Sequence, residues 1–265
     1  MAAPGAVSLL PLAGFPMVQP GDDVAGQILE SASATGIDLA DGDVVVITSK
    51  IVSKAEGRIF DLRTIEPSAR AERFASFTDK DPAMVELVLR ESTDVIRARP
   101  GVLLVRHRLG FISAAAGIDR SNVGAGEGDE NIVLLLPEDP DASATRIRGR
   151  LEEATGVRLG VLLTDSHGRP FRRGNAGVAI GVSGITALHQ LEEQPDLFGR
   201  PLGPTSQVPI GDLLASAAIL VGGEAAEGVP VVVVRGLQVQ GDGTSADLQR
   251  PAEQDLFGYP DAHYL

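Results

Sequence analysis

Residues 102–115 read VLLVRHRLGFISAA. Two apolar runs, Val102 to Val105 and Gly110 to Ala115, flank the short segment Arg106-His107-Arg108, a pattern typical of two antiparallel strands joined in a hairpin. Such a hairpin interrupts the regular alternation of strand and helix that a doubly wound parallel sheet requires. This stretch therefore favours a mixed α/β fold of the α+β kind.

The apolar runs on either side of this hairpin alternate between strand-like and helical periods. Runs rich in β-branched or aliphatic residues predict strands at Asp43–Thr48, Asn131–Leu136, Leu159–Thr164 and Val229–Val234. Helical spacing and start or stop signals predict helices over Asp22–Ala34, after Pro67, from Pro82 with Asp81 as N-cap, through Ala144–Thr155 with an end at Gly156, and over Asp212–Val221. We expect a largely antiparallel or mixed sheet and two intimately packed subdomains.

Composition excludes several classes of function. The 265 residues include no cysteine, which rules out disulfides, thiolate zinc sites and cysteine nucleophiles. The net charge of −13 argues against nucleic-acid binding, although local cations can still hold an anionic substrate. Met1–Leu10 lacks the basic start of a signal peptide, and no apolar run approaches the ~20 residues that span a bilayer. We therefore expect a cytoplasmic protein without a membrane or nucleic-acid partner.

The segment TSKIVSKAEGR, residues 48–58, concentrates the rare lysines of the chain. Lys50, Lys54 and Lys80 are its three lysines, and two of them lie four residues apart directly after a predicted buried strand. An ammonium group at a strand end, with hydroxyls beside it, suits a phosphate group. A solvated strand–loop junction explains the same residues equally well, so both interpretations stay open.

Two further segments place carboxylates after strands. Residues 114–122, AAAGIDRSN, present Asp119 as a possible hard-cation ligand and Asn122 as a hydrogen-bond partner for a base or sugar; an Asp turn capped by Asn122 is the alternative. Residues 161–174, VLLTDSHGRPFRRG, place Asp165, a hydroxyl and three arginines together. That combination favours Mg²⁺ or Mn²⁺ beside phosphates and an anionic substrate, with a structural salt-bridge cluster as the alternative. The four histidines lack zinc-ligand spacing, and we expect most of them on the surface.

The order of these motifs is that of a known family. TSKIVSKAEGR, AAAGIDRSNVG, LLPEDPDASATRIR, LLTDSHGRPFRRG and PVVVVRG together closely resemble coenzyme F420:L-glutamate ligase, the γ-glutamyl ligase of deazaflavin biosynthesis. The resemblance implies a mixed α/β fold, a catalytic domain over 11–236 and a polar C-terminal extension over 237–265. It also implies a homodimer, two divalent Mg²⁺ or Mn²⁺ ions, K⁺, and the substrates GTP, L-glutamate and F420-0.

The resemblance also implies roles for individual residues. The metal ligands implied are Asp119, Asp165, Ser166, where the family often has threonine, and Glu224, which taken alone is also explained as a helix-terminal acid. The nucleotide contacts implied are Phe15, Pro16, Met17 and Val18 through their backbone, with Ser49, Lys54 and Asn122. Arg169 and Arg172 are candidates for substrate binding, and no residue is assigned as general base. Residues 209–213, PIGDL, lack one acidic residue of the family's usual Ala-Asp-Glu-Leu type sequence.

The implied reaction adds L-glutamate to F420-0, and then a second, γ-linked glutamate, through an acyl phosphate formed with GTP. Two other hypotheses fit the same residues: a metal-dependent phosphotransferase that forms no amide bond, and a non-catalytic guanine-nucleotide-binding protein of the same fold. The number of glutamates added, the physiological metal and the saturated or dehydro form of the precursor stay open at this point.

Overall fold

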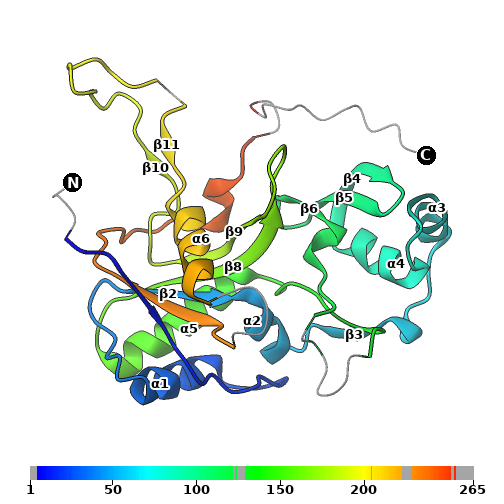
Figure 1. Ribbon diagram of the computed structural model, residues 1–265, viewed down its shortest axis with the longest axis horizontal. Coiled ribbons are helices and arrows are strands. Elements are labelled where there is room, and N and C mark those ends of the chain that lie inside the picture. The colour runs from blue at the N-terminus through cyan, green and yellow to red at the C-terminus, as the bar shows by residue number, and fades with distance from the viewer. Residues whose placement is uncertain are drawn as a thin grey trace.

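A five-stranded mixed sheet forms the centre of the protein. The computed structural model describes residues 5–121, 123, 129–203, 205–222, 228–251 and 254. The strand order is β1 (Ser8–Pro11), β12 (Val231–Arg235), β2 (Val44–Thr48), β8 (Gly160–Gly168) and β9 (Asn175–Ser183). The β2–β8 pair is parallel and the other three pairs are antiparallel, which confirms the predicted mixed fold (Figure 1).

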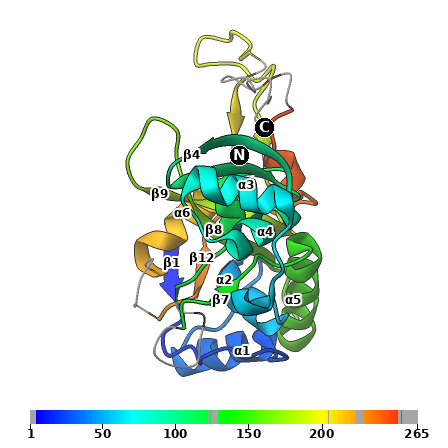
Figure 2. The same cartoon turned by 90° about the vertical axis from the view of Figure 1, so that its right-hand side faces the viewer.

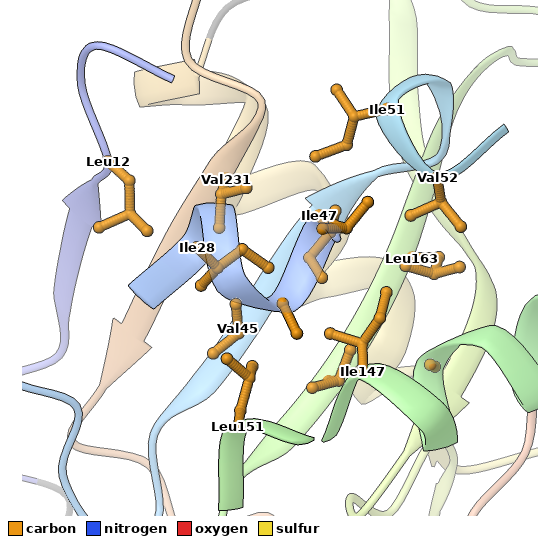
Figure 3. Packing of buried hydrophobic residues seen from close by; sticks show 14 of the residues in the cluster. Leu12, Ile28, Val45, Ile47, Ile51, Val52, Ile147, Leu151, Leu163 and Val231 are labelled. Atoms are coloured by element: carbon orange, nitrogen blue, oxygen red, sulfur yellow. The ribbon is translucent and has the colours of Figure 1, made fainter. Parts of the chain in front are cut away.

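Helices cover both faces of this sheet because its central strands are apolar on both sides. All four residues Val44–Ile47 are buried. On one face, α1 (Val24–Ala34) and α5 (Pro140–Thr155) place Ile28, Ile147 and Leu151 against alternate strand residues such as Val45 and Leu163 (Figure 3). On the other face, α6 (Ile210–Gly222) packs against Val44, Val46 and Leu162. The predicted strands and helices that build these layers are thereby confirmed.

A second apolar core holds the smaller subdomain, which Figure 2 shows in front. It contains α3 (Ala69–Thr78), α4 (Pro82–Arg90) and the antiparallel sheet of β4 (Ser92–Arg99), β5 (Val102–His107) and β6 (Ile112–Ala114). The pairing of Leu104 with Ala114 confirms the hairpin predicted over residues 102–115. A strand pair, β3 (Ile59–Asp61) with β7 (Ile132–Leu134), and the short turns η1 (Leu62–Thr64) and η2 (Ala115–Gly117) connect it to the main sheet.

The helix termini follow the sequence signals. Asp81 accepts a hydrogen bond from the Met84 amide at 2.9 Å and Pro82 occupies the first turn of α4. Asp139 caps α5 in the same way, and Gly156 ends that helix with a φ of 72°. A side-chain acceptor satisfies one otherwise unpaired amide at each start, and glycine adopts the left-handed conformation without strain.

Three sequence interpretations need correction. The strand predicted over Leu159–Thr164 continues to Gly168 because it pairs with β9, which the sequence analysis missed. Residues Ser49–Ala55 form a helix, α2, and not a strand–loop junction. The expectation that most histidines lie on the surface does not extend to His107, which is completely buried in β5, with its ring stacked on Phe111 at 4.9 Å.

The C-terminal part of the described chain packs against the sheet. The Thr186 amide donates to the Val239 carbonyl at 2.7 Å, and Leu248 of η3 (Ser245–Leu248) packs against the core beneath α6. The division into 11–236 and 237–265 stays a prediction. Within the described ranges, no helix is both long and apolar enough to cross a lipid bilayer.

Strands β10 (His189–Gln190) and β11 (Gln207–Val208) begin an arm that extends away from the sheet (Figure 1). Its turn lies near Asp196, whose amide donates to the Arg200 carbonyl at 2.8 Å. Leu197 and Phe198 in this turn are 99 % and 86 % exposed.

Candidate functional site

A cavity of about 860 Å³ lies where the pairing of the two parallel strands, β2 and β8, ends. Thr48 of β2 and Thr164 of β8 are register partners, and both line it. Because parallel strands carry their carboxyl ends to one edge, the segments that follow them meet in this cavity. Other lining residues come from the N-terminal segment, α2, η2 and the segment after it, β8, β9 and α6: Phe15, Pro16, Met17, Val18, Lys50, Lys54, Gly117, Asp119, Arg120, Ser121, Asp165, Ser166, Asn175, Ala218 and Ile219.

Helix α2 carries Lys50 and Lys54, and both line this cavity. The Lys50 ammonium lies 2.6 Å from Asp119 Oδ2 and donates to the Ser121 carbonyl at 3.1 Å. Lys54 is only 6 % exposed, and no carboxylate in the described part of the chain forms an ion pair with it. Burial lowers the pKa of Lys54, repulsion by Lys50 lowers it further, and Asp119 partly opposes both. A buried ammonium without a paired anion makes this wall of the cavity attractive to an anionic ligand.

The backbone on both sides of Asp119 is fixed. Asp119 and Leu134 exchange two backbone hydrogen bonds of 2.9 Å. Its Oδ1 accepts from the amide and the hydroxyl of Ser121 at 2.7 and 2.8 Å. Burial raises the pKa of this carboxyl, but Lys50 and Ser121 outweigh burial and lower it. Asp119 is therefore held ionised in a turn closed by Ser121, whereas the Asn122 cap of the alternative interpretation lies outside the described residues.

The second carboxylate, Asp165, reaches the same cavity from β8. The β8–β9 ladder shifts register between Leu163 and Thr164, just before Asp165. Gly117, two residues before Asp119, lies so close that a Cβ there would be 3.3 Å from Asp165 Oδ2. Asp165 Oδ2 also lies 3.1 Å from Nε2 of His167. Glycine thus lets this carboxylate approach the segment that carries Asp119.

The oxygens of Asp119 and Asp165 suit a hard cation such as Mg²⁺ or Mn²⁺, which takes one or two protein carboxylates and keeps several waters. Among the residues that the structure describes, these two are not joined by a third His, Asp or Glu in one cluster. Asp119 is already paired with Lys50, so binding of a cation by Asp119 requires that ammonium to move. A phosphate group in the cavity would give the Lys50 ammonium other oxygens to bind.

The structure brings together many of the site residues predicted from the sequence. Those that line the large cavity are Phe15, Pro16, Met17, Val18, Lys54, Asp119, Asp165 and Ser166. Ser49 is buried at the start of α2 and does not line it, and the exposed Arg172 lines neither this cavity nor a second, smaller one. Arg169 lines the second, smaller cavity. Asn122 and Glu224 lie outside the described residues.

Sequence reasoning assigned no role to several polar residues of the large cavity, among them Thr48, Thr164 and Asn175. A signal for the first two was present, because the apolar runs VVVIT and VLLT both end in threonine. Asn175 follows the arginine-rich segment, and only the return of β9 alongside β8 brings it back to the cavity.

The cavity thus joins ammonium groups and carboxylates at one sheet edge, the arrangement of an enzyme that handles a phosphate-bearing substrate together with a cation. Comparison with known proteins identifies the family. The model of the family F420-0:Gamma-glutamyl ligase matches residues 14–236. The chain therefore belongs to the F420-0:gamma-glutamyl ligase family, as its motifs indicated.

Relatives match over nearly the whole chain. The chain is 45 % identical to the coenzyme F420:L-glutamate ligase of Methanothermobacter thermautotrophicus over 254 residues, covering 95 % of this chain and 98 % of the relative. It is 45 % identical to that of Methanopyrus kandleri over 245 residues, covering 91 % and 93 %. It is 42 % identical to that of Archaeoglobus fulgidus over 251 residues, covering 95 % and 96 %.

Proposed function

We propose that this protein is an enzyme of coenzyme F420 biosynthesis that adds L-glutamate to F420-0, and a further γ-linked glutamate to F420-1, with GTP converted to GDP and phosphate. The single observation that carries this proposal is the convergence of Lys50, Lys54, Asp119 and Asp165 on one cavity, in a chain that matches the ligase family over residues 14–236. The names of the relatives support the same reaction.

The nucleotide occupies the large cavity in this proposal. The backbone of residues 15–18 lies against the nucleoside, and Lys54 faces the phosphates with Lys50 beside it. Ser49 and Asn122 complete the set of proposed contacts. The large volume, about 860 Å³, accommodates a nucleoside triphosphate with part of a second substrate.

Asp119 and Asp165 hold the divalent cations, Mg²⁺ or Mn²⁺, with Ser166 and Glu224 as further ligands and K⁺ as an additional ion. A divalent cation at these oxygens supplies neutralisation of charge on the phosphates. The chain itself contributes the fixed positions of the two carboxylates, through the Asp119–Leu134 bridge and the hydrogen bond of Asp165 with His167. When Asp119 turns to a cation, Lys50 is free to follow the phosphate oxygens.

The reaction then proceeds in two displacements. A carboxylate oxygen of F420-0 forms a bond to the γ-phosphorus of GTP while the bond from that phosphorus to GDP breaks, giving an acyl phosphate. The neutral amine of L-glutamate then forms a bond to the acyl carbon while the bond from that carbon to the phosphate oxygen breaks, and the one surplus proton of the nitrogen passes to water. The role of the protein is positioning and charge stabilisation, because neither displacement requires a covalent link to a side chain.

Mass spectrometry of the product tests the function. The full-length protein with F420-0, GTP, L-glutamate and Mn²⁺ should yield F420-0 heavier by one glutamyl residue, then by two, with one GDP for each. Glutamate-independent GDP formation with phosphorylated F420-0 as the end product would instead identify the phosphotransferase. GTP binding without GDP formation would identify the non-catalytic protein.

The two carboxylates have a separate test. Asp165→Asn and Asp119→Asn should each abolish turnover and weaken Mn²⁺-dependent GTP binding, measured by isothermal titration, by about tenfold or more, because each removes one negative charge from the cation site. Asp41→Asn, an exposed carboxylate paired with Arg158, is the matched control. Unchanged Mn²⁺-dependent binding in both site variants would contradict the assignment.

A cytoplasmic homodimer completes the proposal. The exposed Leu197 and Phe198 of the arm support it, because large apolar side chains at a projecting turn are typical of a contact with another chain. Light scattering after gel filtration should report a dimer for the wild type and a monomer for a Leu197→Asp, Phe198→Asp double variant. A wild-type monomer at micromolar concentration would refute the dimer without bearing on the reaction.

A further inference from the structure

A second cavity, of about 280 Å³, adjoins the large one. Its lining residues come from the β5–β6 loop, from β8 and β9, from α6 and from the end of η3: Phe111, Ile112, His167, Gly168, Arg169, Pro170, Val178, Ala179, Ile180, Asp212, Leu248 and Gln249. The hydrogen bond between His167 and Asp165 joins the two cavities, because Asp165 lines the large one and His167 the small one. A ligand of the small cavity therefore lies beside the proposed cation site.

Asp212 contributes the negative charge of this cavity. It lies in the first turn of α6, and its Oδ1 accepts a hydrogen bond from the Ala179 amide at 2.9 Å. That amide is available because the β8–β9 ladder shifts register at this point. Within the described ranges, no lysine or arginine forms an ion pair with Asp212. Burial raises the pKa of this carboxyl, although the Ala179 amide and His167 oppose the increase.

The positive charge of the small cavity belongs to Arg169, in the loop between β8 and β9. The exposed Arg169 lines the cavity, and its Nη2 donates to the Arg173 carbonyl at 3.0 Å. The His167 ring, which also lines the cavity, packs on Phe111 with centroids 4.9 Å apart, and Phe111 stacks on the buried His107. The cavity therefore combines a half-buried carboxylate that forms no ion pair with a lysine or arginine in the described part of the chain, a guanidinium and an aromatic wall.

We propose that this small cavity binds the L-glutamate substrate, with the Asp212 carboxylate receiving its ammonium group and the Arg169 guanidinium receiving one of its carboxylates. The inference rests on the proposed function and adds the position of the amine nucleophile. A free amino acid carries both charges that the cavity complements, and L-glutamate, with about ten non-hydrogen atoms, suits a space at the small end of ligand pockets. A nucleoside triphosphate does not suit it, because its polyanion would meet Asp212.

The location also suits the chemistry. An amine held by Asp212 lies on the His167 side of the Asp165–His167 pair, whereas the acyl phosphate forms on the Asp165 side. The two reactants are therefore brought together from adjoining cavities, which lowers the entropic part of the barrier. Asp212 holds the ammonium form until the amine loses its proton to water.

Steady-state kinetics of the full-length protein with F420-0, GTP and Mn²⁺ test the proposal. Asp212→Asn and Arg169→Ala should each raise the KM for L-glutamate about tenfold or more and leave the KM for GTP unchanged, because each removes one charge-assisted contact to the amino acid alone. Asp212→Asn retains an oxygen for the Ala179 amide, so the β9 edge stays intact. Arg169→Lys should raise the KM for L-glutamate less than Arg169→Ala does, because it keeps the positive charge. Asp41→Asn and Arg158→Ala, a surface pair elsewhere, serve as controls.

An assay with hydroxylamine distinguishes a failure of the glutamate site from a failure of the proposed ligase function. Hydroxylamine replaces L-glutamate as the nucleophile and converts the acyl phosphate to a hydroxamate with release of phosphate. Both variants should form hydroxamate at the wild-type rate, because the first displacement does not use the small cavity. An unchanged KM for L-glutamate, or an equal rise in both KM values, would overturn the glutamate site while the ligase function stands. Absence of both hydroxamate and glutamylated product from the wild type would overturn the proposed function, and the glutamate site with it.

Discussion

Lys54 is an ammonium group buried without a paired carboxylate among the described residues. Burying an ammonium removes its hydration, and without a paired anion that cost is not offset. Lys54 is 6 % exposed, lies near a second ammonium on Lys50, and has a pKa lowered by its burial and by that neighbour. A bound phosphate would offset these costs. Stability of the free protein and affinity for the nucleotide should therefore respond oppositely to its removal.

We predict this opposite response for Lys54→Met, which keeps an unbranched side chain one atom shorter and removes its charge. The free energy of unfolding should rise by about 1 kcal/mol, because a buried charge is replaced by an apolar group. The dissociation constant for GTP should rise about tenfold or more, because a charge-assisted contact is lost. Urea unfolding and isothermal titration measure the two quantities. A stability loss with unchanged GTP affinity would identify Lys54 as a purely structural residue.

Several site residues could be predicted from the sequence, but a short helix and the contacts between distant segments could not. Asp119 and Asp165 stood out because each carboxylate follows an apolar strand, and both line the cavity. The helix α2 was missed because its seven residues are too few to display a helical period. The burial of His107 was missed because its neighbour Glu91 lies 3.6 Å away in space but is brought there only by the β4–β5–β6 sheet.

The sequence of strand β9 did not predict a strand, because the reason for its glycines lies in the packing of distant helices. Its sequence NAGVAIGVS contains Gly177 and Gly181, which weaken a strand signal. The reason for both glycines is tertiary: a Cβ on Gly177 would clash with the backbone of Ala215 and Ser216 in α6, and one on Gly181 would clash with the backbone of Pro140 in α5. The two helices therefore approach the edge strand at positions where a side chain has no room.

Gly177→Ala should destabilise the protein by about 1–3 kcal/mol, because the obstacle is helix backbone and α6 must shift as a whole. Gly149→Ala in α5 is the matched control: its Cβ would meet nothing within 4 Å, and alanine there should raise stability by about 0.5–1 kcal/mol. Chemical denaturation of the two variants and the wild type measures both changes in the free energy of unfolding. Equal effects of the two substitutions would contradict the packing of α6 on β9.

At the scale of the whole molecule, one buried carboxylate connects the two subdomains. Glu91, which follows α4, lies 3.0 Å from a guanidinium nitrogen of Arg58 and 3.1 Å from Nε of Arg108. Arg58 follows α2, and its Nε donates to the Leu136 carbonyl at 2.9 Å. The core around the main sheet and the core around α3 and α4 are thus joined by ionic and hydrogen bonds as well as by chain connections. Their joint stability should depend on pH.

The sign of that dependence follows from two pKa shifts. Burial raises the pKa of Glu91, but His107, Arg108 and Arg58 outweigh burial and lower it to about 2, from 4.5. Because Nε2 of His107 lies 3.6 Å from Glu91, beyond good hydrogen-bond distance, we ascribe the lowering mainly to the two arginines. Burial lowers the pKa of His107 below 6.5, although Glu91 opposes it. Both groups therefore bind protons more readily in the unfolded chain, so acid favours unfolding.

The free energy of unfolding should accordingly begin to fall as the pH drops below 6.5, through His107, and should fall by about 3 kcal/mol more between pH 4.5 and 2, through Glu91. Urea unfolding across this range measures the curve for the wild type, His107→Gln and Glu91→Gln. Glu91→Gln should lower stability at neutral pH by about 3 kcal/mol or more, since two guanidiniums lose their partner, and should flatten the curve below pH 4.5. If the Glu91→Gln curve kept the wild-type slope in that range, other carboxylates would carry the acid response and Glu91 would not be the link between the two cores.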